Sequence, residues 1–600
     1  LLPLLPRQIF LTETASPEKR GKEGYAIEMQ SILTPPEGES LFDVTLSYAP
    51  SPLWFVVQAL PGLTEQPDEN STPDLLAAFY GNTLAEALVM QNPEFAAAIA
   101  SQSHAADTLT SPLSQNASLK MVLLEETPWL LEARTEDERI GRLAGLLDRK
   151  RCVAAQHHAL QQLLALQNDD GGFPWRKGMI SHIGQTLSVM EHYVNLYRRG
   201  VLSEDESHVQ LYSRAMSYLS RNLVGDTARI RQQEEVSVQQ LRYLALQAAF
   251  PQALTENEEA GYALLYDRAT RNWRQAGLIG KALTARLLFD SSRKENAHRI
   301  VASLIGSSTS HDGATTWAQD NIEGNSPTGD IARHTLLMET IARIQPDNKR
   351  LPEMAAWLLQ QKEARDWGTT PVTLDALSAL TAYGGLSLDP TEETATIVWG
   401  NDTVAAPRHT YGYIQLSRRG ETAEAGLGRV FFPAKHNEGP GQRPWAGLYR
   451  RYFADADKIV KRGNGISLEK RLYIVRGDSL IALSEATPRV GDKVETQFIV
   501  SAERDLDFVV IKDHRAACLE PADQTSERVL AGYISALRET RDAATHFYIE
   551  HLPKGLHVLT YEAYIDRTGS YLDGSAALQC LYAPQATAHS RGSRIDIGGK

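Results

Sequence analysis

Apolar and polar residues alternate one by one in the first 55 residues of this chain of 600. The clearest run has apolar side chains separated by single polar positions: Phe42, Val44, Leu46 and Tyr48. A period of two places every second side chain on the same face of an extended strand. The opening segment therefore predicts β-strands with one buried face.

From about residue 70 to 385 the apolar positions recur at helical spacing, as in Leu160, Leu163 and Leu164. The pattern predicts roughly a dozen amphipathic helices joined by short turns. Short connections make consecutive helices antiparallel neighbours, so about six helical hairpins are expected. Periodicity leaves open whether these hairpins stack as an open solenoid or close into a ring.

Strand-like alternation returns after about residue 390 and is clear at Val494, Thr496, Phe498 and Val500. The last segment predicts short strands at regular spacing, which is typical of a β-sandwich, with a hairpin turn expected at 553–555. Strand-rich segments flank the helical one on both sides, so the helical domain is predicted to be inserted in a β domain. The expected boundaries are 1–55 and 389–464 for the β domain, 56–388 for the helical domain and 465–600 for the sandwich.

Acidic residues outnumber basic ones by 74 to 61, which gives a formal net charge of -13. Nucleic-acid binding requires clustered Lys and Arg, so no nucleic-acid partner is expected. No apolar run approaches the ~18 residues of a membrane-spanning helix, so we expect no membrane insertion by this segment. The chain opens with LLPLLPRQIF rather than Met. This run is too short and too rich in Pro for a signal peptide, which indicates a fragment of a longer protein.

The polar turn at 167–175 contains two adjacent carboxylates, Asp169 and Asp170, followed by Gly171 and Gly172. Neighbouring carboxylates can raise one another's pKa and so supply a general acid. The alternative is a helix-to-helix turn in which the glycines allow positive φ and Phe173 and Trp175 fill the base of the hairpin. Similar turns recur at 310–317 and 366–370, and recurrence at separate helix junctions favours the structural role.

No other motif predicts catalysis or a bound cofactor. His157 and His158 are adjacent on a helix and point about 100° apart, so they cannot chelate one metal as an i, i+4 pair can. His182 and His192 have no HExxH motif between them, and no GxSxG motif occurs. None of the three cysteines has a neighbouring His that would mark a nucleophile. We therefore expect no catalytic residue, metal site or cofactor, and no enzymatic activity.

A series of short segments resembles the C-terminal part of a bacterial alpha-2-macroglobulin of the kind found in Bacteroidetes. Their shared order along nearly the whole chain makes the resemblance specific. The segments are PLW at 52–54, QALP at 58–61, LEETPW at 124–129, DGGFPW at 170–175, WGTT at 367–370, WAGLY at 445–449, KD at 512–513, RAAC at 515–518, LPKG at 552–555 and YAP at 582–584.

The resemblance implies an α/α-toroid thioester domain inserted in a CUB-like or macroglobulin β domain, followed by a receptor-binding-like macroglobulin sandwich. It also implies a role, because proteins of this family trap proteases that cut an exposed bait region. In thioester-bearing members a Cys-x-Glu-Gln motif opens an early toroid helix. The Cys sulfur and the Gln acyl group form an internal thioester that a protease amine attacks.

Asn70 stands in this chain where the family has Cys, and Pro73 stands where it has Gln. Neither residue can form a thioester, because the bond needs a sulfur atom and a γ-acyl carbon. The residues instead predict a helix start with Thr72 as N-cap, Pro73 at the first helical position and Asp74 in the first turn.

The resemblance therefore implies the C-terminal part of a thioester-less protease inhibitor that acts by steric trapping. Its expected partners are proteases, met through an upstream bait region, and other envelope proteins. The expected location is the bacterial cell envelope, periplasmic or surface-exposed, with a lipoprotein anchor upstream. In that oxidising compartment Cys518 and Cys580 either form a disulfide or remain buried thiols.

Two alternatives stay open. The first is an α-toroid enzyme of the terpene cyclase or prenyltransferase type, whose repeats have similar Asp-Gly-Gly-aromatic turns. Such enzymes need a DxDD acid or a zinc triad, and the sequence contains neither. The second is an envelope protein with a purely structural or interaction role.

Overall fold

The computed structural model describes most of the chain. The described residues are 8–15, 18–20, 24–34, 39–65, 67–97, 145–202, 205–311, 314–317, 329–362, 367–387, 396–405, 414–419, 425–433, 444–455, 466–477, 479–503, 505–541, 544–580 and 587–598. Residues 124–129, 312–313, 366 and 582–584, which belong to motifs named above, lie outside them.

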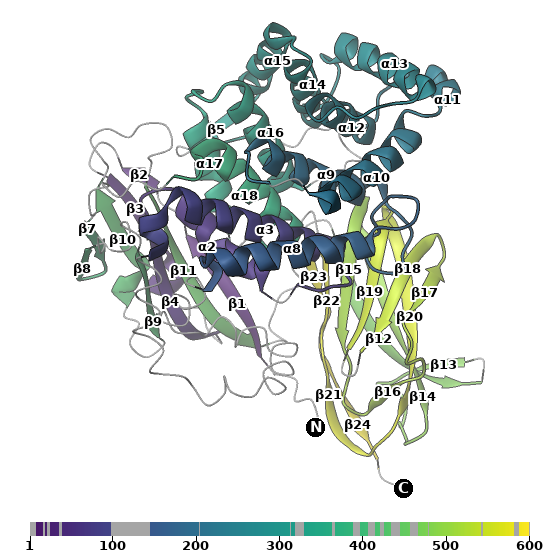
Figure 1. Cartoon of the computed structure of the whole chain (residues 1–600). Coiled ribbons are helices and arrows are strands. Elements are labelled where there is room, and N and C mark those ends of the chain that lie inside the picture. Colours follow the sequence, from purple (N-terminus) through teal and green to yellow (C-terminus); the bar gives the residue numbers. More distant parts are fainter. Residues whose placement is uncertain are drawn as a thin grey trace.

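Strands from both sides of the helical segment share two antiparallel sheets (Figure 1). The first has the order β1-β11-β4-β9 and consists of β1 (Gln8–Ala15), β4 (Glu39–Ala49), β9 (Ile414–Arg419) and β11 (Trp445–Asp455). The second has the order β2-β3-β10-β7-β8 and consists of β2 (Glu18–Arg20), β3 (Gly24–Glu28), β7 (Thr396–Trp399), β8 (Asp402–Ala405) and β10 (Arg429–Pro433). Two short helices, α1 (Gln30–Leu33) and η5 (Ala425–Gly428), pack together beside them. The helical block is thus an insertion in a β domain, as the sequence predicts.

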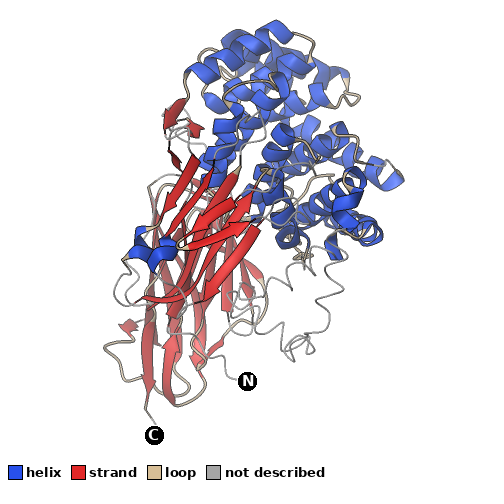
Figure 2. Cartoon of the chain, turned by 90° about the vertical axis from the view of Figure 1, so that its left-hand side faces the viewer, coloured by secondary structure: helices blue, strands red, loops and turns tan. Residues whose placement is uncertain are grey.

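Between these strands the chain forms a block of helices. Their bounds are α2 (Leu53–Thr64), α3 (Thr72–Gln91), α8 (Arg149–Leu166), α9 (Ile183–Arg198), α10 (Glu206–Leu223), α11 (Thr227–Gln232), α12 (Val238–Ala249), α13 (Glu256–Asn272), α14 (Leu278–Asp290), α15 (Lys294–Gly306), α16 (Asp330–Ile344), α17 (Leu351–Gln360) and α18 (Thr370–Gly384). A short hairpin, β5 (Thr309–His311) and β6 (Ala314–Thr316), precedes α16. Figure 2 shows these helices in blue at one end of the molecule, next to the strands in red.

The helices close into a toroid. In the described part of the chain, the inner ring runs α3, α9, α12, α14, α16, α18 and back to α3, each helix packing against the next. The outer helices α2, α10, α13, α15 and α17 each bridge two inner ones, and α8 packs against α3 and the outer helix α10. The ring closes where Asn92 Nδ2, after α3, donates to the Leu386 carbonyl after α18 at 2.7 Å.

Burial follows this inner and outer division. The inner helix α3 is buried on nearly all sides, whereas the outer helix α10 buries a stripe that includes Leu211, Ala215 and Leu219. A helix with one apolar stripe can cover a core but cannot lie within it. The sequence therefore contains the distinction between the two rings, although it leaves their closure open.

The last segment forms a β-sandwich, in agreement with the predicted fold class. One sheet has the order β13-β12-β14-β20-β16 and consists of β12 (Ile466–Arg476), β13 (Ser479–Ala482), β14 (Lys493–Ala502), β16 (Leu519–Pro521) and β20 (Gly555–Ile565). The other has the order β17-β18-β19-β15-β22-β23 and consists of β15 (Leu506–His514), β17 (Glu527–Ala531), β18 (Ile534–Thr540), β19 (Ala544–Leu552), β22 (Ala576–Cys580) and β23 (Thr587–His589). A small ribbon pairs β21 (Gly569–Asp573) with β24 (Ser593–Ile597).

The prediction of a hairpin turn at 553–555 is wrong. These residues join β19 in one sheet to β20 in the other, so the chain crosses the sandwich there. Alternation identifies a strand, but the choice of a pairing partner depends on contacts that are distant in sequence.

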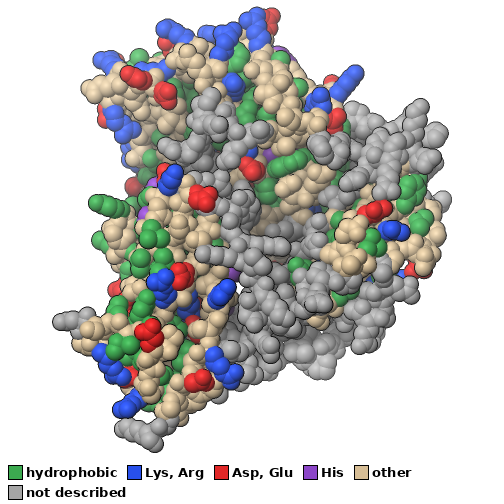
Figure 3. Space-filling model, turned by 180° about the vertical axis from the view of Figure 1, so that it is seen from behind, with side chains coloured by type: hydrophobic (Ala, Val, Ile, Leu, Met, Phe, Trp, Pro, Cys, Tyr) green, Lys and Arg blue, Asp and Glu red, His purple; other side chains and the backbone are tan. Residues whose placement is uncertain are grey.

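Charged side chains are dispersed over the surface. In the face seen in Figure 3, the described acidic and basic side chains are interspersed rather than gathered by sign. Among the described helices, none is both long enough and apolar enough to cross a membrane.

Candidate functional site

Asn70 and Ser71 lie in the turn that leads into α3. The main-chain N–H of Asn70 donates to the Asp68 carboxylate at 3.0 Å, and the N–H of Ser71 donates to the Asp68 carbonyl at 2.9 Å. The Asn70 carbonyl accepts a hydrogen bond from the N–H of Lys177 at 2.9 Å. Asn70 itself is exposed. Position 70 is thus held through its main chain and presents an amide to solvent.

Helix α3 begins one residue earlier than the capping pattern predicts. Ser71 is the N-cap residue and Thr72 is already helical, so the prediction of Thr72 as N-cap is wrong. Thr72 instead binds a neighbouring loop: its hydroxyl donates to the Pro174 carbonyl at 2.6 Å and its N–H donates to the Trp175 carbonyl at 3.0 Å. Pro73, the next residue, is buried. Tertiary hydrogen bonds have replaced the local cap.

The neighbouring loop is the Asp-Gly-Gly turn, and its geometry confirms the structural interpretation. Gly171 has φ +90°, and a Cβ atom there would lie 2.4 Å from the Arg214 carbonyl oxygen. The Asp170 carboxylate accepts from the N–H of Gly172 at 2.9 Å and from the Ser181 hydroxyl at 2.6 Å. Asp170 therefore holds the turn in shape.

Trp175 contacts the last domain rather than the base of its own hairpin. Its ring lies edge-on to Phe508 at 5.2 Å between centroids and edge-on to Tyr548 at 5.5 Å. Phe173 does pack in the helical core, as predicted, but the prediction for Trp175 is wrong. The sequence reveals that Trp175 is apolar, but not that its partners lie more than 300 residues away.

Arg176 is the charged centre of this contact. Its guanidinium forms ion pairs with Asp68 at 2.9 Å and with Glu539 at 3.3 Å, and it lies 4.4 Å from the ring centroid of Tyr548. Its side chain is only 7% exposed. Burial alone would raise the pKa of Glu539, but the hydrogen bond with His546 and the charge of Arg176 lower it to about 2. No pattern in the sequence predicted Arg176 as a site residue, although it directly follows the DGGFPW motif.

We call the residues Asp68, Thr72, Trp175, Arg176, Phe508, Glu539 and Tyr548 the α3 junction. They connect the start of α3, the 173–177 loop and the strands β15, β18 and β19 of the last domain. Asn70 and Pro73 lie beside or within this junction, between the helical block and the sandwich.

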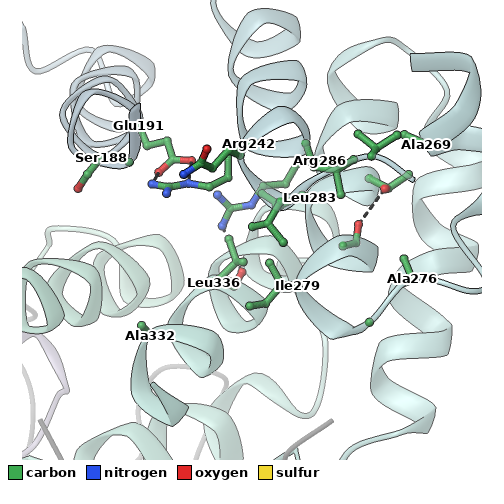
Figure 4. Close-up of a pocket in the computed structure, with 18 of the residues that line it drawn as sticks. Ser188, Glu191, Arg242, Ala269, Ala276, Ile279, Leu283, Arg286, Ala332 and Leu336 are labelled. Atoms are coloured by element: carbon green, nitrogen blue, oxygen red, sulfur yellow. Dashed lines mark hydrogen bonds and ion pairs between the residues drawn. The ribbon is translucent and has the colours of Figure 1, made fainter. Parts of the chain in front are cut away.

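A second feature is a cavity of about 790 Å³ inside the helical ring. Figure 4 shows Glu191, Arg242 and Arg286 toward one end, with Leu283 and Ile279 in the apolar remainder. Arg242 binds Glu191 through two hydrogen bonds of 2.9 and 2.6 Å. Burial alone would raise the pKa of Glu191, but the charge of Arg242 lowers it. The cavity is therefore lined by an ionised, paired carboxylate.

Two further charged pairs lie in the wall of this cavity. Arg286 Nη2 lies 3.2 Å from a Glu339 carboxylate oxygen. His192 Nε2 lies 3.1 Å from the Asp375 carboxylate, and this contact raises the pKa of His192 although burial would lower it.

Cys518 and Cys580 are both buried thiols of the sandwich core in the structure. Burial raises the pKa of Cys518 to about 12, and the Cys580 thiol donates to the Asp507 carbonyl at 3.1 Å. Their pairing as a disulfide stays a prediction. In the described part of the chain, no group of three or more His, Cys, Asp or Glu side chains is placed to hold a metal ion.

Comparison with known proteins relates the fold to one family. Residues 465–585 match the family model for the bacterial alpha-2-macroglobulin MG10 domain. None of the curated proteins matches the chain.

Solved structures with similar folds include alpha-2-macroglobulins. One from Salmonella, reacted with methylamine, matches 100% of this chain with a TM-score of 0.60 and 12% identity. The Escherichia coli protein from domain MG7 to the C-terminus also matches 100% of this chain, with a TM-score of 0.59 and 13% identity. The native Escherichia coli protein matches 98% with a TM-score of 0.60 and 12% identity. This chain spans 34% of the Salmonella chain, 83% of the MG7-to-C-terminus chain and 33% of the native Escherichia coli chain.

Proposed function

We propose that this chain, which belongs to the bacterial alpha-2-macroglobulin family, is the C-terminal part of a protease inhibitor that has lost its thioester. Such a protein would hold proteases by steric entrapment and not by a covalent bond. Its setting would be the bacterial cell envelope, with proteases as the partners of the whole protein.

The observation that carries the proposal is the chemistry of positions 70 and 73. Asn70 offers an amide where a thiolate would be needed, and Pro73 has no side-chain acyl group. Amines attack a thioester because a thiolate is a good leaving group, and neither residue can supply that bond. The loss therefore removes covalent capture whatever the surrounding fold.

The α3 junction supports a non-covalent role for the same place. Thr72 binds the 173–177 loop, and Arg176 binds both Asp68 and Glu539. A buried ion pair breaks at high cost when one partner leaves, so this contact can hold the helical block against the last domain in the resting protein.

The ring cavity gives little support to the alternative of an α-toroid enzyme. A carboxylic acid that protonates a substrate needs a raised pKa, whereas Arg242 lowers the pKa of Glu191. Asp375 is likewise paired with His192. Tightly paired groups of this kind favour a structural role for the cavity wall.

The test is treatment of the protein with methylamine, followed by thiol titration after denaturation. We expect no increase in the number of thiols, because no thioester is present to cleave. The matched variant combines Asn70→Cys, Thr72→Glu and Pro73→Gln, which restores the complete motif at its proposed place. Release of one new thiol from the unchanged protein would contradict the proposal.

A second measurement separates steric trapping from no inhibition at all. A full-length protein that contains this chain should protect a protein-sized substrate from a protease but leave cleavage of a short peptide unchanged. Denaturing electrophoresis should then show no covalent adduct with the protease. Equal cleavage of both substrates with and without the protein would contradict inhibition.

A further inference from the structure

A lysine lies between two aspartates in the core of the last domain. Lys470 on β12 has its Nζ atom 2.7 Å from a carboxylate oxygen of Asp513 on β15. The same Nζ atom lies 2.8 Å from each of the two carboxylate oxygens of Asp573, at the end of β21. The three side chains are 2%, 0% and 1% exposed, respectively.

The cluster has one cation for two potential anions. If both aspartates were ionised, the core would carry an uncompensated negative charge, which is costly in an apolar interior. Burial and the nearby charge of Asp513 raise the pKa of Asp573 well above its usual range, despite the opposing effect of Lys470. The Tyr561 hydroxyl donates to Asp513 at 2.6 Å, so Asp513 acts as a hydrogen-bond acceptor there. We therefore assign the proton of the pair to Asp573.

An exposed ion pair of the same domain shows the contrast. Lys493 lies 2.6 Å from one Glu562 oxygen, but these side chains are 34% and 40% exposed. Water can solvate both groups there, and water also hydrolyses and competes at a reacting carbonyl. At Lys470 the amine, the carboxylic acid and a second carboxylate are held together without that competition.

We propose that Lys470 and Asp573 condense into an intramolecular isopeptide bond, with Asp513 as the proton acceptor. The Lys470 ammonium gives one proton to the Asp513 carboxylate, and the neutral Nζ attacks Cγ of the protonated Asp573 carboxyl group. An Nζ–Cγ bond forms and a Cγ–O bond breaks. The hydroxyl group leaves with a proton as one water molecule, and Asp513 keeps the proton that came from Lys470.

The balance of charge favours this product. The starting cluster contains one ammonium, one carboxylate and one carboxylic acid, whereas the product contains an amide and one carboxylic acid. No buried charge remains, so the desolvation cost of the ion pair disappears.

Asp573 is the acyl partner because Nζ lies equally close to both of its oxygens, which brings the amine near the carbon between them. The link would join β12, where the described part of this domain begins, to β21, 103 residues further on. Closing a long loop with a covalent bond restricts the unfolded chain more than closing a short one. This inference is independent of protease inhibition and concerns the durability of the domain.

The test is the intact mass of the purified, folded chain, followed by peptide mapping. We expect a mass lower than the sequence mass by one water molecule, and a branched peptide that joins Lys470 to Asp573. The variant Lys470→Arg keeps the positive charge but should have the full sequence mass. The variant Asp513→Asn keeps both reacting groups but should remain unlinked, because it lacks the proton acceptor.

The intact mass of the unchanged protein tests the proposal even if a variant fails to fold. A full sequence mass after prolonged incubation of the folded protein would overturn the proposal. A branched peptide that joins Lys470 to Asp513 would overturn the assignment of Asp573. A loss of water mapped elsewhere in the chain would also count against the link.

Discussion

The guanidinium of Arg176 lies over the ring of Tyr548, 4.4 Å from its centroid, and so connects the helical toroid to the final β-sandwich. The two residues are 372 positions apart in the sequence. The ion pairs of Arg176 with Asp68 and Glu539 surround this contact. The start of α3, where we propose that the lost thioester site lies, is thereby held against the last domain.

Replacing Arg176 should loosen this contact. The variant Arg176→Ala removes the cation of Asp68 and leaves Glu539 paired with Arg541, which should lower the local stability by about 2 kcal/mol. Hydrogen exchange of the Thr72 and Lys177 amides measures the effect, because both donate across the junction. The control is Arg271→Ala, whose ion pair with Asp267 is exposed and should contribute at most about 0.5 kcal/mol. Equal exchange in both variants would contradict a role for Arg176.

Gly171 in the Asp-Gly-Gly turn and Gly178 a few residues later provide a matched pair of substitutions. Gly171 and Gly178 have similar φ values, +90° and +86°, but only Gly171 has a neighbour close to the position of a new Cβ atom. Gly178→Ala should lower the free energy of unfolding by about 1 kcal/mol because of backbone strain. Gly171→Ala should lower it by about 2 kcal/mol more, because the new Cβ atom clashes with the Arg214 carbonyl. Thermal unfolding of the two variants checks the difference. Similar melting temperatures would show that Arg214 can move aside.

His334 should make the helical block sensitive to acid. Burial lowers the pKa of His334 to about 3, although the contact with the Met354 carbonyl opposes this effect. The folded state therefore binds this proton less tightly than the unfolded state does. The contribution of neutral His334 to the free energy of unfolding is fully present above about pH 6.5. It is lost as the pH falls toward 3, at about 1.4 kcal/mol per pH unit.

The measurement is the melting temperature between pH 7.5 and 4.5. The variant His334→Gln has no imidazole to titrate, so it should lose less stability over this range than the unchanged protein. His158→Gln serves as the control, because the side chain of His158 is 63% exposed. An identical loss in His334→Gln and the unchanged protein would count against the assignment.

Limited proteolysis tests the proposed division into domains. The earliest cuts should fall near the expected boundaries, between residues 385 and 395 and between 456 and 465, because proteases cut most readily at domain boundaries. The boundary expected at residue 55 lies within α2, which begins at Leu53 and packs in the helical core. A cut there should therefore be slow, and a site near residue 66 should be preferred. Early cleavage inside α3 or α16 would contradict the division.

Thiol titration under non-reducing conditions tests the pairing of Cys518 and Cys580. If they remain thiols, as in the structure, the unfolded protein should show three reactive thiols and the native protein should react slowly. Burial raises the pKa of Cys518 to about 12, so the reactive thiolate is scarce in the folded state. A count of one thiol after unfolding would establish the disulfide instead.

Local pattern was sufficient to predict the strands, the helical hairpins and the insertion of one domain in another. Period-two alternation at Val494 to Val500 and helical spacing at Leu160 to Leu164 are properties of neighbouring residues. The proposed loss of thioester chemistry is equally local, because the proposal depends only on the atoms that Asn70 and Pro73 carry.

Only the tertiary structure decided how these elements meet. The closure of the ring through Asn92 and Leu386, and the position of Trp175 against Phe508, join residues that no periodicity connects. The same holds for Lys470, which the fold places between Asp513 and Asp573. Spacing along the chain shows which face of an element is buried, but which distant face covers it depends on packing throughout the molecule.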